Sequence, residues 1–478
     1  EMLTLFPLLW LAGMVASAAD APEGPHPVVI DAGSAGTRQY HAVVIDAGST
    51  GVRAHIFGWE PQPCAFDKPS PVVVPRMIET KSVRPGISSR KPDSVNQSLA
   101  QLVDFAQSTL AGRREDWDHF PIYLMATAGL RRERPEHRDK LLLDIRDVLR
   151  GSQFHFQDDF VRILSGEEEG AFGWLALNAV LGNLGSPLDS VGMLDLGGAS
   201  FQITFVPQAG EVLGSSYPLL LGGTQTNLYS QSYLQYGYKV AQRLLTRRLI
   251  AQNLVGEISS VLEHPCFPRG LNHTELLIGS EDDEGADGNE TPPLRAVWHG
   301  VGDYVECASQ VEKLFPKGGS CYNPPCTFGG RYQPRLLDRQ FIAFSTFGFI
   351  ARVLALPSDT KLEDIEGAAQ YICKVDWSTL RERLRDYPED VVRTLCFSAT
   401  YIVALLHVGL GFDKKKSQIE FREDLAASPN ITWAAGAIIW ETNLRFNSKQ
   451  PLCLQPARGH GEVCSSDGSP APPPASGP

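Results

Sequence analysis

Two short glycine-containing turns, each preceded by an aspartate, hold the residues of this chain whose types and spacing favour chemistry. The first lies in Val43–Arg53, with the sequence VVIDAGSTGVR, and the second in Met193–Gln202, with the sequence MLDLGGASFQ. In both, an apolar run ends at the aspartate, small residues follow, and an alternating run leads away, which predicts a strand, a tight turn and a second strand. Turns of Gly and Ser let backbone N–H groups approach an anion closely, because no Cβ intervenes.

The two aspartates, Asp46 and Asp195, predict a divalent cation near two phosphate-binding turns. A carboxylate repels phosphate, but it binds a cation or the waters around one, and the cation then bridges to phosphate. Between the turns in sequence lies a run of three acids, Glu167–Glu169. Phosphoryl transfer depends mainly on positioning and charge stabilisation, so a carboxylate that reaches one water suffices as the base. The alternative is a solvated helix start, because acids favour the first turn of a helix.

Five sequence blocks resemble, in order, those of the ectonucleoside triphosphate diphosphohydrolase (NTPDase or apyrase) family, and most closely its cell-surface members. The blocks are the Asp46 turn, Ala126–Arg131 (ATAGLR), Glu167–Trp174 (EEEGAFGW), the Asp195 turn and Phe341–Phe347 (FIAFSTF). Further similar stretches are Arg84–Ser88, Gly300–Cys307 and Ile431–Trp433. The resemblance extends from about Val43 to Asn443, and the order of several rare motifs identifies the chain as a member of this family.

The resemblance implies an α/β fold of two RNase H-like lobes, of the actin/hexokinase superfamily, with the active-site cleft between them. It also implies hydrolysis of nucleoside tri- and diphosphates to monophosphates with Ca²⁺ or Mg²⁺. The expected boundaries are 1–18 for a signal peptide or signal anchor, 19–41 for an extra segment, 42–164 together with 426–443 for lobe I, 165–425 for lobe II, and 444–478 for a C-terminal tail that is disordered at its end.

The same resemblance implies a role for each site residue. Glu169 is the expected general base that activates water, and Glu168 is its main competitor. Ser200 and Thr127 are expected to position that water, with Gln202 close by. Asp46 and Asp195 are expected to order the water shell of the metal. The residues expected to bind phosphate are Ser49, Thr50, Gly51, Arg53, Gly197, Gly198 and Ala199.

In cell-surface members of the family, aromatic side chains of lobe II bind the nucleobase. Phe349 is the candidate for one face of the base, whereas Leu395 occupies the position before Cys396 where an aromatic residue is expected. The alternative for Phe349 is an ordinary core position, which we expect for Phe344 and Phe347. Stacking contributes roughly 1–3 kcal/mol per base, so the loss of one face predicts low discrimination between purine and pyrimidine nucleotides.

Length and composition favour a large globular chain. Its 478 residues are 43% hydrophobic, which is enough for an extensive core and for two or more domains. A net charge of −12 argues against nonspecific binding of nucleic acid. A run of five acidic residues lies in 281–288, which we interpret as a solvated loop without a catalytic role.

The amino terminus and the sequons predict a secretory route. Residues 2–18 resemble a signal sequence with a small-residue cleavage site, and an uncleaved anchor is the alternative that would attach the protein to a membrane. Asn96, Asn272 and Asn430 are candidate glycosylation sites, and Pro292 makes a further sequon at Asn289 a poor one. Residues 465–478 are rich in Ser, Gly and Pro and contain no membrane helix. We therefore expect a secreted or lumenal protein.

Nine cysteines in a secreted chain predict disulfides and at least one unpaired thiol. By resemblance to the family, the pairs are Cys266–Cys307, Cys321–Cys326 and Cys373–Cys396. Cys453 and Cys464 are candidates for a local loop, which leaves Cys64 alone.

The first turn is nearly duplicated 15 residues upstream, where 28–38 has the sequence VVIDAGSAGTR. Only the second copy is followed by a good second strand, His55–Trp59, so we expect it to occupy the site and Asp31 to be a bystander. The alternatives are that the first copy pairs in the sheet and displaces the second, or that the duplication is an artefact of the sequence.

Two other functions compete with nucleotide hydrolysis. A pyrophosphate or polyphosphate hydrolase needs to bind only the phosphates, and an inactive secreted nucleotide-binding protein would retain binding without phosphate release. Sugar kinases and actin share the fold but lack the Glu169 block, so the fold alone does not determine the activity.

Overall fold

The structure is a computed structural model of the chain. It describes residues 39–60, 62–63, 72–87, 92–208, 210–211, 214–221, 224–253, 261–276, 295–316, 321, 324–336, 339–423, 431–449 and 453–454. The chain divides into two units, 1–38 and 39–478. The predicted signal segment, the first copy of the duplicated turn and the acidic run 281–288 lie outside the described residues.

The first sheet contains five strands in the order β4-β2-β1-β5-β6. Their bounds are Arg76–Val83 for β4, Val52–Trp59 for β2, Tyr40–Ala47 for β1, Ile122–Ala126 for β5 and Val161–Ile163 for β6. β1 pairs antiparallel with β2 and parallel with β5. The predicted strand, turn and strand around Asp46 is therefore confirmed, and the second copy of the duplicated motif forms it.

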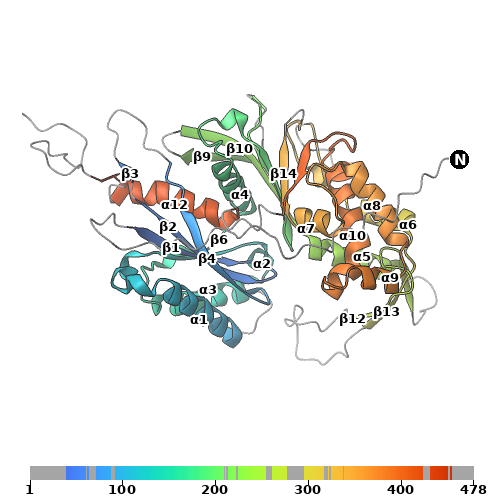
Figure 1. Cartoon of the computed structure of the whole chain (residues 1–478), viewed down its shortest axis with the longest axis horizontal. Helices are drawn as coiled ribbons and strands as arrows, with labels where there is room; N and C mark the ends of the chain where they lie inside the picture. The colour runs from blue at the N-terminus through green and yellow to red at the C-terminus, as the bar shows by residue number, and fades with distance from the viewer. Residues whose placement is uncertain are drawn as a thin grey trace, which may run out of the picture. The chain divides into compact units, whose positions relative to one another are not determined.

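Both faces of this sheet are covered by helices (Figure 1). Val43 and Ile45 of β1 join the cluster that contains residues of α1 (Pro92–Thr109) and α3 (Pro135–Arg150). Ala42 and Val44 join a second cluster with residues of α12 (Trp433–Lys449). Successive side chains of a strand point to opposite faces, so a strand covered on both sides is a continuous apolar run that ends at Asp46.

The second sheet repeats this topology. Its order is β15-β14-β7-β8-β10-β9. The bounds are Ile419–Phe421, Phe341–Ser345, Gly192–Leu196, Ser200–Phe205, Thr224–Leu234 and Ser216–Leu221, in the same order. β7 pairs antiparallel with β8 and parallel with β14, as β1 pairs with β2 and β5. Two lobes of one design are thus confirmed, with β9 as an additional edge strand.

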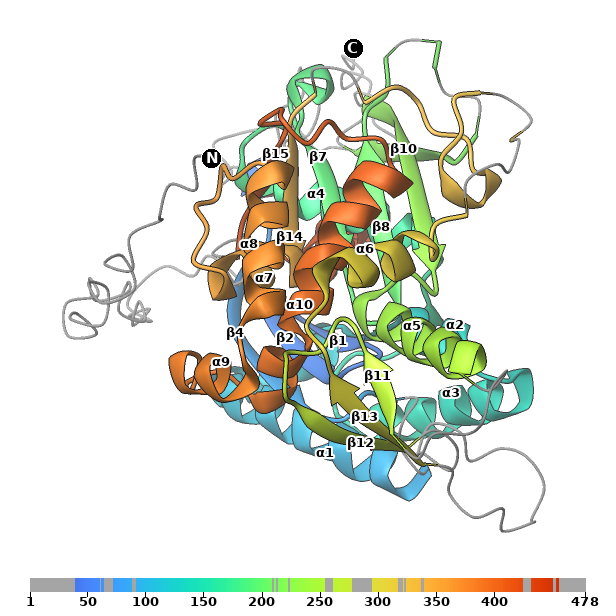
Figure 2. The ribbon, with the colours of Figure 1, turned by 90° about the vertical axis from the view of Figure 1, so that its right-hand side faces the viewer.

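The helix α4 (Gly166–Val180) lies between the second sheet and α12. Trp174 and Leu175 pack with Met193 and Phe344 of the sheet. On its other side Phe172 joins the cluster of α12. Figure 2 shows α7 (Thr346–Val353), α8 (Leu362–Lys374) and α10 (Glu389–Val403) on the opposite face of the second sheet.

The remaining elements surround these two sheets. The helices are α2 (Ala128–Arg131), α5 (Tyr238–Asn253), α6 (Tyr304–Glu312) and α9 (Trp377–Arg383). A small sheet has the order β11-β13-β12, with bounds Leu262–His264, Arg295–Gly300 and Asn272–Leu276, and β3 (Gln62–Pro63) pairs with β16 (Cys453–Leu454). Short 3₁₀ segments are Ala111–His119, Asp158–Phe160, Pro187–Asp189 and Phe328–Gly330, and a π-helix spans Ala404–Gly409.

One helix is apolar and long enough to cross a membrane, Glu389–Gly409, among the residues that the structure describes. Its apolar window is 78% buried inside the fold, so its composition follows from packing against the second sheet. At the carboxyl end, α12 continues past Asn443 to Lys449, and Cys453 lies in β16. The helix thus extends beyond residue 443, and the boundary of the tail at 444 stays a prediction.

The structure contains disulfides between Cys266 and Cys307, between Cys321 and Cys326, and between Cys373 and Cys396. These are the pairs expected from the family. Cys64, Cys464 and Asn430 lie outside the described residues. The candidate glycosylation sites Asn96 and Asn272 are both exposed, on α1 and β12 respectively.

Candidate active site

The two aspartate turns have the same backbone geometry. In the first, the Gly48 N–H donates to the Gly51 carbonyl at 3.0 Å; in the second, the Gly197 N–H donates to the Ser200 carbonyl at 3.0 Å. Asp46 is paired across its hairpin with Arg53, and Asp195 is paired with Gln202. In each hairpin one further residue pair separates the aspartate pair from the turn. Each aspartate therefore lies near the carboxyl end of a central strand of its sheet.

The two turns face each other closely. A Cβ on Gly198 would lie 2.6 Å from Thr50 Cγ2 and 2.9 Å from Ser49 Oγ. Beside them, Ala128 of α2 packs with Ala199 of the second turn. Residues predicted to bind phosphate from the two lobes thus lie in direct proximity, as a clamp on one polyphosphate requires.

Glu169 lies in the first turn of α4, where Ser165 is the N-cap and its hydroxyl accepts the Glu168 N–H. The Glu169 Oε2 accepts hydrogen bonds from Arg131 Nη2 at 2.7 Å and from Gln202 Nε2 at 3.2 Å. Gln202 Nε2 also lies 2.8 Å from Ser200 Oγ. The structure therefore brings Glu169, Ser200 and Gln202 together at the second turn.

Glycines on one side of α4 allow this approach. A Cβ on Gly166 would lie 2.2 Å from Ser232 Cβ, and one on Gly170 would lie 2.5 Å from Thr204 Oγ1. Both glycines therefore face the strands β8 and β10, with no space for a larger side chain. The close contact between helix and sheet brings the Glu169 carboxylate within reach of Gln202.

Burial dominates the electrostatics of Glu169. Desolvation raises its pKa from 4.5 to about 7, because the charged form loses its hydration. The Arg131 guanidinium lowers this pKa, and the charges of Asp195 and Asp46 raise it. A carboxyl group with a pKa near neutrality is suited to accept a proton from water and release it again.

The two aspartates are suited to a cation. Burial raises the pKa of Asp46 and that of Asp195 from 3.8 to about 6, and the charge of Asp46 contributes to the shift at Asp195. The Oδ1 atoms of both aspartates are buried and have no hydrogen-bond partner among the described residues. A cation would satisfy both oxygens. No cluster of three or more His, Cys, Asp or Glu occurs in this part of the chain, so two carboxylates would hold it together with water.

Glu168 pairs with Arg162, which is not one of the partners of Glu169. The Glu168 Oε1 accepts a hydrogen bond from Arg162 Nη1 at 2.6 Å, and Arg162 Nη2 lies 3.7 Å from Glu441 Oε1 of α12. The adjacent acid of the same helical turn is thus engaged in an ion pair away from the two aspartate turns, whereas Glu169 lies beside them.

The sequence matches the model of the GDA1/CD39 (nucleoside phosphatase) family over residues 37–454. The chain belongs to this family. It is 30% identical to probable apyrase 6 of Arabidopsis thaliana, over 87% of this chain and 72% of that protein. It is also 30% identical to ectonucleoside triphosphate diphosphohydrolase 1 of Rattus norvegicus (89% and 82%) and 32% identical to ectonucleoside triphosphate diphosphohydrolase 2 of Homo sapiens (75% and 74%).

Among solved structures, the chain is similar to a nucleoside triphosphate hydrolase of Neospora caninum. The TM-score is 0.57 at 18% identity, and the match covers 86% of this chain and 95% of the other. At this identity the likeness concerns the fold, and it agrees with the two repeated sheets. The GDA1/CD39 match and the curated relatives make the chain an enzyme of the nucleoside phosphatase family.

Two residues of the site are additions to those predicted from the sequence. Arg131 ends the ATAGLR block and donates to Glu169 Oε2 at 2.7 Å, and it lies 3.4 Å from Ser200 Oγ. Ser345 lies in the FIAFSTF block, has a φ of 57°, and its side chain hydrogen-bonds Asp195 and lowers the pKa of that carboxyl. Both belong to blocks that the sequence already singled out. For Ser345 the available signal was a polar side chain at the end of a strand, whereas Arg131 lies at the end of α2, where only its place in the block marked it.

Thr127 and Arg53 lie at the edge of the first turn. Thr127 follows β5, is 5% exposed, and donates its N–H to the Ala47 carbonyl at 3.3 Å. Arg53 Nη1 donates to Asp46 Oδ2 at 3.3 Å. Arg53 therefore binds the Asp46 carboxylate, and its contact with phosphate stays a prediction.

Phe349 packs against the apolar cluster that includes Leu196 and Phe201 of the second hairpin. It is half-buried on α7, and the Arg352 guanidinium lies 5.4 Å from the centres of both the Phe349 and Tyr387 rings. Phe344 and Phe347 are 2% and 0% exposed, so their predicted core positions are confirmed. Leu395 is fully buried.

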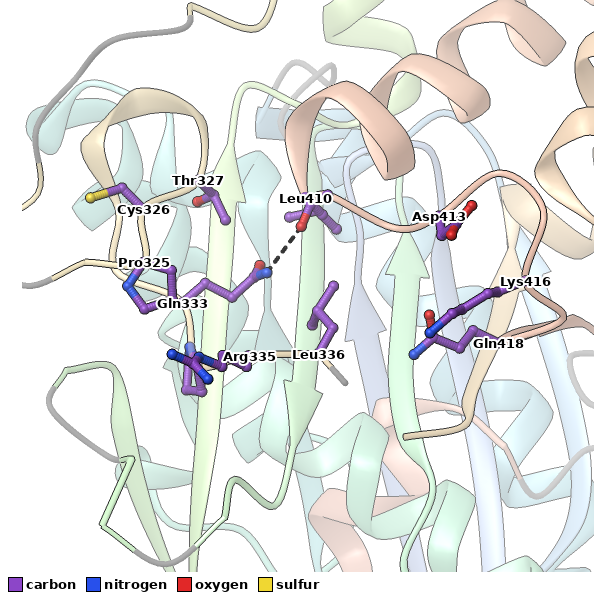
Figure 3. A pocket seen from close by; sticks show the side chains of 12 residues that line it. Pro325, Cys326, Thr327, Gln333, Arg335, Leu336, Leu410, Asp413, Lys416 and Gln418 are labelled. Carbon is purple, nitrogen blue, oxygen red and sulfur yellow. Dashed lines mark hydrogen bonds between the residues drawn. The ribbon is translucent and has the colours of Figure 1, made fainter. Parts of the chain in front are cut away.

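A cavity of about 420 Å³ lies at the other end of β14 from Asp195 (Figure 3). Its lining includes Gln333, Arg335, Leu410 and Asp413. No residue of the two turns lines this cavity, and its lining has a single carboxylate, that of Asp413. Its composition therefore does not match a site for a metal and phosphate.

Proposed function

We propose that this protein hydrolyses nucleoside tri- and diphosphates to monophosphates and phosphate at the two aspartate turns, with a divalent cation. The observation that carries the proposal is the position of Glu169. It is buried, it contacts Arg131 and Gln202, and its pKa of about 7 responds to the charges of both Asp46 and Asp195.

In the proposed reaction Glu169 takes a proton from a water molecule. The water oxygen attacks the terminal phosphorus in line and forms a new O–P bond. The bond from this phosphorus to the bridging oxygen breaks, and the shortened nucleotide leaves with that oxygen. Ser200 and Thr127 orient the water, and Gln202 fixes Ser200 and Glu169 relative to each other through its two short contacts, at 2.8 and 3.2 Å. A second round on the diphosphate gives the monophosphate.

Backbone N–H groups of the turns, with Arg53, would bind the phosphate oxygens. The residues that would donate are Ser49, Thr50, Gly51, Gly198 and Ala199, whereas the Gly197 N–H closes the second turn by donating to the Ser200 carbonyl, so Gly197 would line the phosphate site without that donor. Asp46 and Asp195 would hold the cation, whose charge offsets that of the polyphosphate. Ca²⁺ and Mg²⁺ both prefer such oxygen ligands.

We propose weak base selectivity. Phe349 offers one aromatic face, and Leu395 is buried in the core and offers none. We expect kcat/KM for purine and pyrimidine diphosphates to differ by about tenfold or less, because a single stacking face acts on every base. A preference of several hundredfold for one base, measured with ADP, GDP, UDP and CDP, would contradict this.

We propose a secreted or lumenal location in the secretory pathway, with membrane attachment only if the N-terminal segment is retained. The disulfides between Cys266 and Cys307 and between Cys373 and Cys396 support an oxidising compartment. Exposure of Asn96 and Asn272 is compatible with glycosylation. A shift in mobility after glycosidase treatment of the protein from secreting cells would test both points.

The proposed function is tested by phosphate release from ATP, ADP, UDP and pyrophosphate with Ca²⁺, for the wild type and for Glu169→Gln. We expect the wild type to hydrolyse the nucleotides and the variant to lose about 10²- to 10⁴-fold in kcat, the usual contribution of a general base. Glu168→Gln is the matched control, since it removes a neighbouring carboxylate that pairs with Arg162, and we expect less than about a fivefold loss.

Other outcomes select the competing functions. Release from pyrophosphate alone would indicate a pyrophosphate or polyphosphate hydrolase. Nucleotide binding without release from any substrate would indicate a catalytically inactive nucleotide-binding protein. A larger loss in Glu168→Gln than in Glu169→Gln would move the base to Glu168.

A further inference from the structure

Each aspartate turn is backed by a glycine at an equivalent position of its lobe. β4 ends at Val83 and β10 ends at Leu234, and these strands flank β2 and β8 in the two sheets. Gly86 is the third residue after β4, and Gly237 is the third residue after β10. In both lobes, therefore, the segment that follows this flanking strand meets the aspartate turn at an equivalent glycine.

Gly86 contacts the backbone of the first turn. A Cβ at this position would lie 2.4 Å from the Ser49 carbonyl oxygen and 2.6 Å from that of Gly48. Both distances are far below van der Waals contact, and the atoms in question belong to backbone rather than to a flexible side chain. Any other residue at position 86 must therefore displace the turn or its own segment.

Gly237 contacts the backbone of the second turn in the same way. A Cβ there would lie 2.4 Å from the backbone N and C atoms of Ala199 and from the Ser200 N. The segment around it is hydrogen-bonded to the turn: the Gln235 N–H donates to the Ala199 carbonyl at 3.0 Å, and the Tyr238 N–H donates to the Gly197 carbonyl at 2.9 Å. The start of α5 and the second turn therefore form one rigid backbone unit.

We propose that Gly86 and Gly237 are a matched pair of positioning residues, which fix the backbone of the Ser49 turn and of the Ala199–Ser200 turn, respectively, for phosphate and water. This inference rests on the proposed function, and it extends that function to two residues outside the turns. A displacement of about 1 Å in a catalytic group can cost on the order of 10²-fold in rate.

The two glycines have different consequences, because the turns have different contacts. Ser200 lies in the hydrogen-bond group of Gln202, Arg131 and Glu169. A shift at Gly237 therefore moves the residues that orient the attacking water. The side-chain hydrogen bonds of Glu169 among the described residues go to Arg131 and Gln202 and not to Ser49, whose predicted role is to bind phosphate. A shift at Gly86 therefore acts on substrate binding.

The experiment compares Gly86→Ala and Gly237→Ala with Gly112→Ala and Gly185→Ala. The two control positions have no atom within 4 Å of an added Cβ. Steady-state hydrolysis of ADP with saturating Ca²⁺ gives kcat and KM, and circular dichroism and Tm report folding. We expect Gly86→Ala to raise KM about tenfold or more with kcat within threefold, and Gly237→Ala to lower kcat about 10- to 100-fold with KM within threefold.

Each alternative outcome overturns the inference for the glycine concerned. Kinetics equal to those of the two controls would show that the turn tolerates the added atom. A variant that is unfolded at 25 °C would show a role in folding rather than in local positioning. If the wild type itself hydrolyses no nucleotide, the proposed function fails separately from this inference. Calorimetric binding of a nonhydrolysable ATP analogue then tests Gly86. We expect Gly86→Ala to weaken the affinity for the analogue about tenfold, and an unchanged affinity would refute the role of Gly86.

Discussion

The Asp46 hairpin and the Asp195 hairpin have the same turn and the same place in their sheets, but they differ in the residue opposite each aspartate. Opposite Asp46, Arg53 donates to the carboxylate itself. Opposite Asp195, Gln202 Nε2 lies within hydrogen-bond distance of Glu169, Ser200 and Ser232. The first hairpin therefore compensates its own charge, whereas the second is connected to the proposed base. The two hairpins share one backbone geometry, but the residue opposite the aspartate gives each of them a different set of contacts.

A second difference lies in the neighbouring parallel strand. The residue paired with the end of β1 is Ala126, and the residue paired with the end of β7 is Ser345. Ser345 has a positive φ and hydrogen-bonds Asp195, while alanine has no group to offer Asp46. Backbone strain at a non-glycine residue is typical of functional sites. Asp46 is thus stabilised by the charged donor Arg53, whereas Asp195 is stabilised by the uncharged Ser345.

The largest expected effect comes from the aspartates, whose equivalence the substitutions Asp46→Asn and Asp195→Asn test. We expect each to lower kcat/KM by about 100-fold or more and to raise the Ca²⁺ concentration needed for half-maximal activity, because the cation loses one of two carboxylates. Titration of activity with Ca²⁺ measures both. A large loss in only one variant would show that the two aspartates do not contribute equally to activity.

The same variants have a predicted effect on stability. Burial raises the pKa of each carboxyl from 3.8 to about 6 in the folded state, so the folded protein binds more protons than the unfolded one between these values. The contribution of these two carboxyl groups to stability without metal is then highest below about pH 4 and declines as pH rises to about 6. At pH 8, the metal-free Asn variants should have a higher Tm than the wild type, and a lower Tm would contradict the assigned shift.

The next effect separates the two arginines. Arg131→Met removes the charge that lowers the pKa of Glu169, so we expect the acid limb of the pH–rate profile, near pH 7 in the wild type, to move up by about 1 unit or more. Activity at pH 7 should fall about fivefold or more, since the ionised fraction of the base drops from about one half to about one eleventh when its pKa rises from 7 to 8. Arg53→Met is the control and should leave the limb in place with a smaller loss. The profile of kcat at saturating Ca²⁺ measures both, and equal shifts would show that Arg53 also acts on Glu169.

The smallest effect probes the contact between the hairpins. Gly198→Ala places a Cβ 2.6 Å from Thr50 Cγ2, and we expect an increase in KM of about tenfold or less, because the Thr50 side chain can rotate. Adding Thr50→Ser removes that methyl group and keeps the hydroxyl, so the double variant should regain most of the loss. A double variant no better than Gly198→Ala would mean that the turns do not meet at this contact.

Much of the site could be predicted from the sequence, because its parts are local. The apolar run, the aspartate and the Gly-Ser turn specify a hairpin within about ten residues, and the structure has both hairpins where they were expected. The order of the five blocks identified the family, and the nucleoside phosphatase match agrees. The packing of α12 against β1 joins residues that are far apart in sequence, so no local pattern contains it.

The sequence by itself determined the turns, the acids near them and the topology that repeats around them. Only the tertiary structure decided which acid meets the turns. Glu168 and Glu169 are neighbours on one helix, and a helix of 3.6 residues per turn points them about 100° apart. Gly166 and Gly170 fix which side of α4 contacts β8 and β10, and so Glu169 reaches Gln202 and Arg131 while Glu168 pairs with Arg162. The rotation of one helix against a sheet depends on contacts between distant residues, which local patterns do not contain.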